Sequence, residues 1–161
     1  MKKTLAILLA ALLALGFAAC AKTTETKSAN QITIFAAAEL ENALTEIAQW
    51  YTDAEKNPNA KKDAVVLFDC GETDALAAKL ADGAYCDVFI PAGMEALGSR
   101  DLAGPSAFSI KGTASDGSEV SYPAAQLNMS DRQDAAGAFL DYLKGDDAKA
   151  IFEKHGFTVN P

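Results

Sequence analysis

Two short stretches of the sequence have the residue types and spacing of an anion-binding site. In the first, three alanines at residues 36–38 follow an apolar run at residues 31–35, and from Leu40 onward apolar residues recur at helical spacing. A buried strand that leads directly into a helix leaves unpaired N–H groups and the positive end of the helix dipole at the turn. Because Ala37 and Ala38 are small, a ligand can approach that backbone. The stretch therefore predicts an anion site where the helix begins.

The second stretch repeats this arrangement. An apolar run at residues 64–69 is followed by CGET, which contains Glu72 and Thr73, and then by a helical pattern that ends at Gly83. Thr73 is the expected N-cap, since a threonine side chain at that position accepts a hydrogen bond from a free N–H group of the first turn. A third apolar run, at residues 86–90, predicts a further buried strand.

The alternation of strands and helices predicts the fold class. We expect one α/β domain with a mostly parallel central sheet and helices on both faces. In such a sheet the strand-to-helix turns lie along one edge, which places residues 36–39, 70–73 and 91–94 beside one another. A hairpin is expected farther along the chain, with strands at residues 108–110 and 120–122. A ligand site is expected at the edge where the turns meet.

The C-terminal part has the pattern of two helices that cover the sheet. Ser130 followed by Gln133 is a capping-box signature, and apolar residues at helical spacing continue to Gly145 and then to Gly156. His155 is the only histidine. We expect it to be a partly exposed residue at a helix end, where the dipole favours a cation, rather than a ligand.

The cysteines Cys70 and Cys86 suggest three kinds of chemistry. A disulfide is not expected, because one residue follows the end of a strand and the other begins the neighbouring strand, about 15 Å away. A catalytic thiolate at Cys70 lacks a histidine partner, and its acidic neighbours Asp69 and Glu72 would raise the pKa of the thiol. A metal site that combines these groups with Glu39 has no ligand spacing pattern. We therefore expect two free thiols, no enzyme activity and no metal or other cofactor.

The first nineteen residues have the pattern of an export signal. Lys2 and Lys3 precede an apolar run at residues 5–15, which is too short to span a membrane. Residues 1–19 are therefore expected to be removed as a signal peptide.

Cys20 ends the segment GFAAC, which resembles the lipobox of bacterial lipoproteins. This predicts a lipid on Cys20, a polar tether at residues 20–30 and a single lobe at residues 31–161. Ordinary signal-peptidase cleavage after Ala19, which would leave Cys20 as a terminal thiol, is the alternative.

The composition excludes nucleic acid as a partner. The formal charge is −8, and it is near −10 once the leader with its two lysines is removed. Binding to a phosphate backbone needs clustered Lys and Arg, and the sequence has no such cluster. Roughly 140 residues follow the leader, which is enough for one domain with one core.

Three blocks of the sequence resemble the molybdate-binding proteins of bacterial ABC importers. They are ITIFAAA with its helix, FDCGETDALAAKLADGAYCDVFIPA, and YPAAQL with AAGAFLDYLKGDDAKAIFEKHGF. The resemblance implies one lobe of a type II periplasmic-binding-protein-like fold. It also implies a periplasmic protein, or one anchored at the outer face of the cytoplasmic membrane, that works with an ABC transporter permease. In that family molybdate or tungstate lies between two lobes and is held by hydroxyl and backbone N–H groups without a counter-cation.

The resemblance implies an oxyanion site at Ala37, Ala38, Glu39, Glu72 and Thr73. Glu39 occupies the position of a family serine that follows the three alanines, and Thr73 matches a second ligand serine. The carboxylate is a departure from the family. A dianion about 4 Å from a carboxylate would be repelled by roughly 8 kcal/mol at an effective dielectric of 20. The alternative is that Glu39 is an ordinary acid of a first helical turn, aimed at solvent.

The second departure is the length of the chain. In the family a complete second lobe follows the third strand, and here only a short segment and the hairpin lie between Ala92 and Pro123. Apolar surface is expected where the second lobe would join. The leading prediction is a substrate-binding lipoprotein of an importer for molybdate or a similar oxyanion. The alternative function is a non-transport interaction module, or a remnant of a transport protein whose pocket is vacant.

Overall fold

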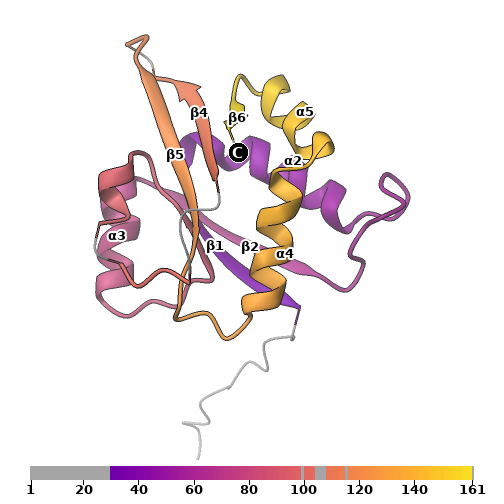
Figure 1. Cartoon of the computed structure of the whole chain (residues 1–161), viewed down its shortest axis with the longest axis horizontal. Coiled ribbons are helices and arrows are strands. Elements are labelled where there is room, and N and C mark those ends of the chain that lie inside the picture. The colour runs from indigo at the N-terminus through magenta and orange to yellow at the C-terminus, as the bar shows by residue number, and fades with distance from the viewer. Residues whose placement is uncertain (1–29, 99, 104–107, 115, 161) are drawn as a thin grey trace, which may run out of the picture.

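The computed structural model describes residues 30–98, 100–103, 108–114 and 116–160 (Figure 1). They form one six-stranded sheet with the strand order β2-β1-β3-β5-β4-β6. The strands are β1 (Gln31–Ala37), β2 (Val65–Gly71), β3 (Val88–Ile90), β4 (Phe108–Thr113), β5 (Glu119–Gln126) and β6 (Thr158–Asn160). The helices are η1 (Ala38–Leu40), α2 (Glu41–Thr52), α3 (Thr73–Ala81), η2 (Met94–Ala96), α4 (Gln133–Leu143) and α5 (Asp146–Lys154).

The sheet is mixed, and the prediction of a mostly parallel sheet was wrong. Strand β1 is parallel to β2 and to β3, as expected for two crossovers through helices. The other three pairings, β3 with β5, β4 with β5, and β4 with β6, are antiparallel. The reason is local: β4 and β5 form a hairpin, so the strand that returns beside β3 runs against it.

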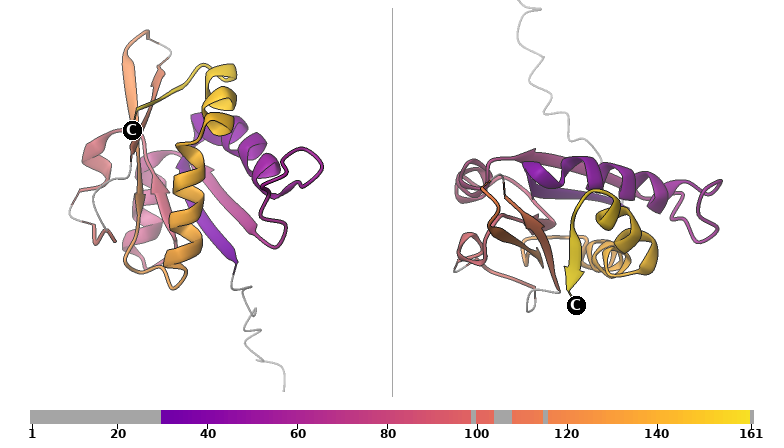
Figure 2. Two further views of the ribbon diagram at one scale, coloured as in Figure 1. Left: turned by 45° about the vertical axis from the view of Figure 1, so that its right-hand side comes forward. Right: turned by 90° about the horizontal axis from the view of Figure 1, so that it is seen from above.

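Helices cover both faces of the sheet, which confirms the predicted layering. One face packs on α2, α4 and α5 through a core that includes Ile32, Leu44 and Phe139. The opposite face packs on α3 through a smaller cluster around Phe35 and Leu76. Figures 1 and 2 show α4 and α5 on the same side of the molecule as α2, with α3 on the other side.

Several predicted boundaries need correction. The third strand is shorter than expected and begins at Val88, because Cys86 and Asp87 belong to the approach to the strand. A short 3-10 turn, η1, lies between β1 and α2. The hairpin is confirmed with longer strands than expected, and β6, which the sequence did not predict, adds to its outer side. The two C-terminal helices are confirmed, and His155 is the half-buried residue that ends the second of them.

The capping-box prediction at Ser130 was wrong, because Arg132 occupies the N-cap position of α4. The Ser130 oxygen accepts the Arg132 N–H at 3.1 Å, before the helix begins, and the Ser130 hydroxyl donates to the buried carboxylate of Asp87. Asp87 is fully buried and accepts hydrogen bonds from the Thr33 N–H at 2.7 Å, the Tyr85 hydroxyl at 2.6 Å and the Ser130 hydroxyl at 2.5 Å. Helix α4 begins three residues after Ser130, at Gln133, and no side chain caps it. Asp87 therefore joins β1, the start of β3 and the entry to α4.

Exposed apolar side chains lie only in part where predicted. The large ones among the described residues are Val65, Leu67, Met94 and Met129. Met94 follows Ala92 closely, where the second lobe would join, and the other three lie outside that segment. The signal peptide, Cys20 and most of the tether lie outside the described residues. Within the described part of the chain, no helix is long and apolar enough to cross a membrane.

Candidate functional site

Three chain reversals meet at one edge of the sheet, as the parallel pairing predicts. Ala37, the last residue of β1, is in register with Gly71, the last residue of β2. On the other side of β1, Ala36 is in register with Ile90 at the end of β3. The turns after these strands enclose a hollow of about 550 Å³, which we call the turn-edge hollow. It is lined by Glu39, Gly71, Glu72, Thr73, Asp74, Ala92, Glu95 and Ala96.

Thr73 joins two of the turns directly. Its Oγ1 accepts a hydrogen bond of 2.9 Å from the backbone N–H of Ala92, in the turn after β3. The prediction that Thr73 caps α3 was wrong: Thr73 is the first helical residue, and Glu72 occupies the N-cap position without a side-chain bond. The Thr73 oxygen uses a lone pair to accept the Ala92 N–H, which leaves its hydroxyl hydrogen free for a different bond. Thr73 can therefore donate that hydrogen to a ligand.

Backbone donors at the helix starts complete the polar groups of the hollow. The first N–H groups of an α-helix have no acceptor four residues earlier. In α3 the first backbone bond to a preceding residue is from the Leu76 N–H to the Glu72 carbonyl, at 3.1 Å. The N–H groups of Thr73 and Asp74 precede that bond and lie at the positive end of α3.

The residues predicted for the site are only partly brought together. Glu39, Glu72 and Thr73 line the turn-edge hollow. Ala37 is buried at the end of β1, and Ala38 is exposed at the start of η1, and neither lines the hollow. Sequence reasoning missed Asp74 and Glu95, although both are acids in the first turn of a helical segment next to a predicted site turn.

The lining of the turn-edge hollow is strongly acidic. Glu39, Glu72, Asp74 and Glu95 are exposed carboxylates, and no Lys, Arg or His is among the lining residues. A dianion about 4 Å from one carboxylate is repelled by roughly 2 kcal/mol in a water-like dielectric and by about 8 kcal/mol at an effective dielectric of 20. The exposure of Glu39 favours the lower figure. The hollow therefore has the hydrogen-bond donors that an oxyanion site needs, but the carboxylates of its rim repel an anion.

Cys70 has the properties of an unreactive thiol. It is half-buried and free, and Cys86 is buried and free, as predicted. Burial raises the pKa of Cys70 to about 11, with smaller contributions from Glu41 and Asp69. Glu72 was expected to raise the pKa of this thiol, but the second acid that raises it is Glu41, in the first turn of α2. At neutral pH the thiol is protonated, which is unsuited to nucleophilic attack.

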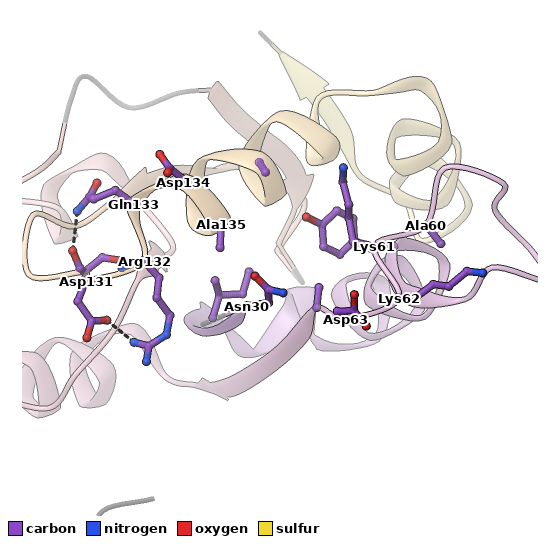
Figure 3. A pocket seen from close by; sticks show the side chains of 15 residues that line it. Asn30, Ala60, Lys61, Lys62, Asp63, Asp131, Arg132, Gln133, Asp134 and Ala135 are labelled. Carbon is purple, nitrogen blue, oxygen red and sulfur yellow. Dashed lines mark hydrogen bonds and ion pairs between the residues drawn. The ribbon is translucent and has the colours of Figure 1, made fainter. Parts of the chain in front are cut away.

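A second and larger hollow lies at the opposite end of β1, and the sequence did not predict it. Its volume is about 940 Å³, and it lies between the start of β1, the loop before β2 and the N-terminus of α4 (Figure 3). Its cations Lys61, Lys62 and Arg132 are matched by Asp63, Asp131 and Asp134. Arg132 forms an ion pair with Asp131, drawn as a dashed line in Figure 3. We refer to it as the mixed-charge hollow.

No group of three or more His, Cys, Asp or Glu side chains among the described residues is arranged to hold a metal ion. The four acids of the turn-edge hollow are therefore a rim of separate carboxylates rather than a metal centre.

Comparison with protein families decides the class of the molecule. The family model described as bacterial extracellular solute-binding protein matches residues 32–112 and 113–158, which is more than half of the chain. The chain belongs to this family. The match covers β2, β3, β4 and β5 completely and all but the first residue of β1, and all three turns of the turn-edge hollow lie in its first part. The family is one of solute-binding proteins rather than a class of enzymes.

Solved structures agree with this assignment at the level of the fold. One is described as the substrate-binding domain of a molybdenum ABC transporter from Clostridium difficile. It has 15% sequence identity and a TM-score of 0.62, and the alignment covers 80% of this solute-binding protein and 98% of that chain. The other is the sulfate-binding protein SubI from Mycobacterium tuberculosis, with 10% identity, a TM-score of 0.59, and coverage of 80% and 86%.

At these identities the likeness concerns the fold, which is that of a periplasmic-binding-protein-like lobe. Comparison with the curated proteins gives no match.

Proposed function

We propose that this solute-binding protein captures a tetrahedral oxyanion of the molybdate, tungstate or sulfate class for an ABC importer, and that the anion binds in the turn-edge hollow. The family assignment supports solute capture, and the two structural relatives are described as a domain of a molybdenum ABC transporter and as a sulfate-binding protein. The observation that carries the choice of site is the bond between Thr73 and Ala92. It fixes the turn after β3 against the start of α3, whose N–H groups and Thr73 hydroxyl are the donors beside the hollow.

The proposed binding chemistry uses neutral donors. The N–H groups at the start of α3 and the hydroxyl of Thr73 donate to the anion, and the helix dipole adds a favourable field. Each such bond replaces a bond to water, so its net contribution is only about 1 kcal/mol when the site is open on one side. The acidic rim opposes these terms. We therefore expect weak binding, with an affinity that the rim carboxylates limit.

The N-terminal region gives the proposed protein its location. We propose that residues 1–19 are removed during export, that Cys20 carries a lipid, and that residues 20–30 tether the lobe to the outer face of the membrane. A permease in the same membrane would then receive the anion. Mass spectrometry of the exported protein tests this proposal. A lipid mass on Cys20 that is lost in Cys20→Ala supports it, and an unmodified terminal thiol after cleavage at Ala19 contradicts it.

Isothermal titration tests the proposed function. The exported protein is titrated with molybdate, tungstate and sulfate, and the same series is repeated with Glu39→Ser. Removal of one carboxylate from the rim relieves about 2 kcal/mol of repulsion for a dianion, so the association constant should rise about tenfold or more. Glu153→Ser is the matched control, because it makes the same charge change at an exposed position of α5.

Two results distinguish the proposed function from the alternative. A saturable signal that Glu39→Ser strengthens and Glu153→Ser leaves unchanged supports oxyanion capture. No signal from any version favours an interaction module or a remnant with a vacant hollow. The acidic lining without a cation is the observation that favours this second candidate.

A further inference from the structure

The outer edge of β2 is open. Strand β2 is the first in the order of the six strands, so within the described residues it pairs with β1 alone. The Val65 N–H donates to the Asn30 carbonyl at 3.1 Å, and in a parallel ladder alternate residues bond to the same neighbour. The backbone N–H and C=O groups that face β1 are therefore those of Val65, Leu67, Asp69 and Gly71. The N–H and C=O groups of Val66, Phe68 and Cys70 point away from the sheet.

The side chains along this edge do not protect it. Val65 and Leu67, which project from one face of β2, are 42% and 45% exposed. The next side chain on this face is the carboxylate of Asp69, which forms an ion pair with Lys79, with 2.6 Å between Oδ2 and Nζ. Proteins usually guard an edge strand with unpaired charges, a proline or a bulge. Among the described residues of β2 there is no proline and no lysine, so the strand is suited to pairing with another strand.

The two ends of β2 carry opposite charges. Lys61, Lys62 and Asp63 precede the strand with a net charge of +1 (two cations and one anion), and Glu72 and Asp74 follow it with a net charge of −2. No ion pair involves any of these five side chains within the part of the chain that the structure describes. The net charge therefore changes sign across Phe68, the middle residue of β2.

We propose that two copies of this protein associate through β2, with the strands antiparallel about a two-fold axis at Phe68. In that register Val66 of each copy faces Cys70 of the other, and Phe68 faces its own equivalent. These are the residues whose backbone groups point outward, so the strands exchange about six main-chain hydrogen bonds and the two sheets become one. Leu67 of each copy lies beside Asp69 of the other, whose charge Lys79 already balances.

Charge complementarity identifies the partner as a second copy. The two-fold axis brings Lys61 and Lys62 of one copy to the end of β2 where the other copy has Glu72 and Asp74. The same match occurs at both ends of the paired strands. A strand from an unrelated protein would match both ends only by chance, whereas a net charge that changes sign along the strand is complementary to itself under a two-fold rotation. Asp63 reduces the attraction at each end, because it precedes β2 beside the two lysines.

The association has a consequence for the turn-edge hollow, which rests on the proposed function. Glu72 and Asp74 also line that hollow. Lysines of a second copy beside them would reduce the repulsion that an oxyanion meets. The association itself does not depend on anion binding, so sedimentation without any oxyanion tests it separately.

Charge reversal tests the proposal. The protein is expressed with its own leader, purified as the cell exports it, and sedimented to equilibrium at about 1 μM to about 1 mM. Unmodified protein should show a monomer–dimer equilibrium. Lys61→Glu/Lys62→Glu and Glu72→Lys/Asp74→Lys should each raise the dissociation constant at least about tenfold, because like charges then meet at both ends. An equimolar mixture of the two variants should recover dimers. Lys149→Glu, on α5, is the control and should leave the equilibrium unchanged.

Amide hydrogen exchange gives a second readout that does not depend on variants. In the dimer the N–H groups of Val66, Phe68 and Cys70 should be protected at high protein concentration and should exchange faster on dilution. Those of Leu67 and Asp69, which bond to β1, should not depend on concentration. A monomer at every concentration, or a dimer that both charge reversals leave intact, would overturn the proposal.

Discussion

The hydrogen bond between Thr73 and Ala92 gives a quantitative test of how the turn-edge hollow is held together. Thr73→Val keeps the branched shape of the side chain and removes the oxygen that accepts the Ala92 N–H at 2.9 Å. Leaving a buried donor unsatisfied costs about 1–3 kcal/mol. Thr73 and Ala92 are both half-buried, so water can partly replace the lost acceptor. We therefore expect a loss of about 1–2 kcal/mol in the free energy of unfolding.

Urea denaturation of three proteins measures this loss. Thr73→Ser retains the hydroxyl and is the matched control, with an expected loss of less than about 1 kcal/mol from the missing methyl group. Amide exchange at Ala92 should accelerate in Thr73→Val and not in Thr73→Ser. If valine and serine at this position gave equal stability and equal exchange at Ala92, the bond would not hold the two turns together and the reasoning would be refuted.

Three further predictions concern other parts of the lobe. Asp87→Ala removes the acceptor of three hydrogen bonds in the core and should lower the free energy of unfolding by about 3 kcal/mol or more, with a smaller loss in Asp87→Asn, in thermal or urea denaturation. Hydrogen bonds from Lys154 and then His155 lower the pKa of Glu46. Its stabilising contribution is therefore complete above the ordinary carboxyl pKa of 4.5 and lost as the pH falls through the lower native value. Accordingly, the stability advantage of the wild type over Glu46→Gln should be present above pH 4.5 and should vanish in acid; a difference that grows in acid would contradict the assignment. With a pKa of about 11, Cys70 should react with iodoacetamide at pH 8 about a hundredfold more slowly than an ordinary cysteine, and its rate should still rise above pH 9.

The sequence predicted the features that depend on neighbours along the chain. Apolar periodicity located β1, α2 and the two C-terminal helices, and the rule for parallel strands placed the turns near Glu39 and Thr73 at one edge. The helices and strands are local features, so the residues of each segment are enough to predict them. The position of the turns follows from the parallel order of the strands and needs no knowledge of side-chain contacts.

Features that depend on distant contacts could not be predicted. The hydroxyl of Thr73 bonds to Ala92, which is nineteen residues away, instead of capping its own helix. Ser130 likewise bonds to Asp87, forty-three residues earlier in the chain, and α4 begins later than its capping signature indicates. In both cases the hydroxyl bonds to a half-buried or buried partner that is distant in the sequence, and Ser130 also accepts the N–H of Arg132 before α4 begins. The acids Asp74 and Glu95 were visible in the sequence, but only the fold shows that they share one hollow with Glu39.

The most direct test of the proposed function is a titration of ¹⁵N-labelled protein with molybdate, followed by amide chemical shifts. If the anion binds in the turn-edge hollow, the N–H signals of Glu39, Thr73 and Asp74 should shift in a saturable manner, and the shifts should saturate at lower molybdate in Glu39→Ser. Shifts confined to the mixed-charge hollow, at Asn30 and Gln133, would place the anion at the wrong end of the sheet. Such a result, or no saturable shift at any of these residues, would contradict the proposed site.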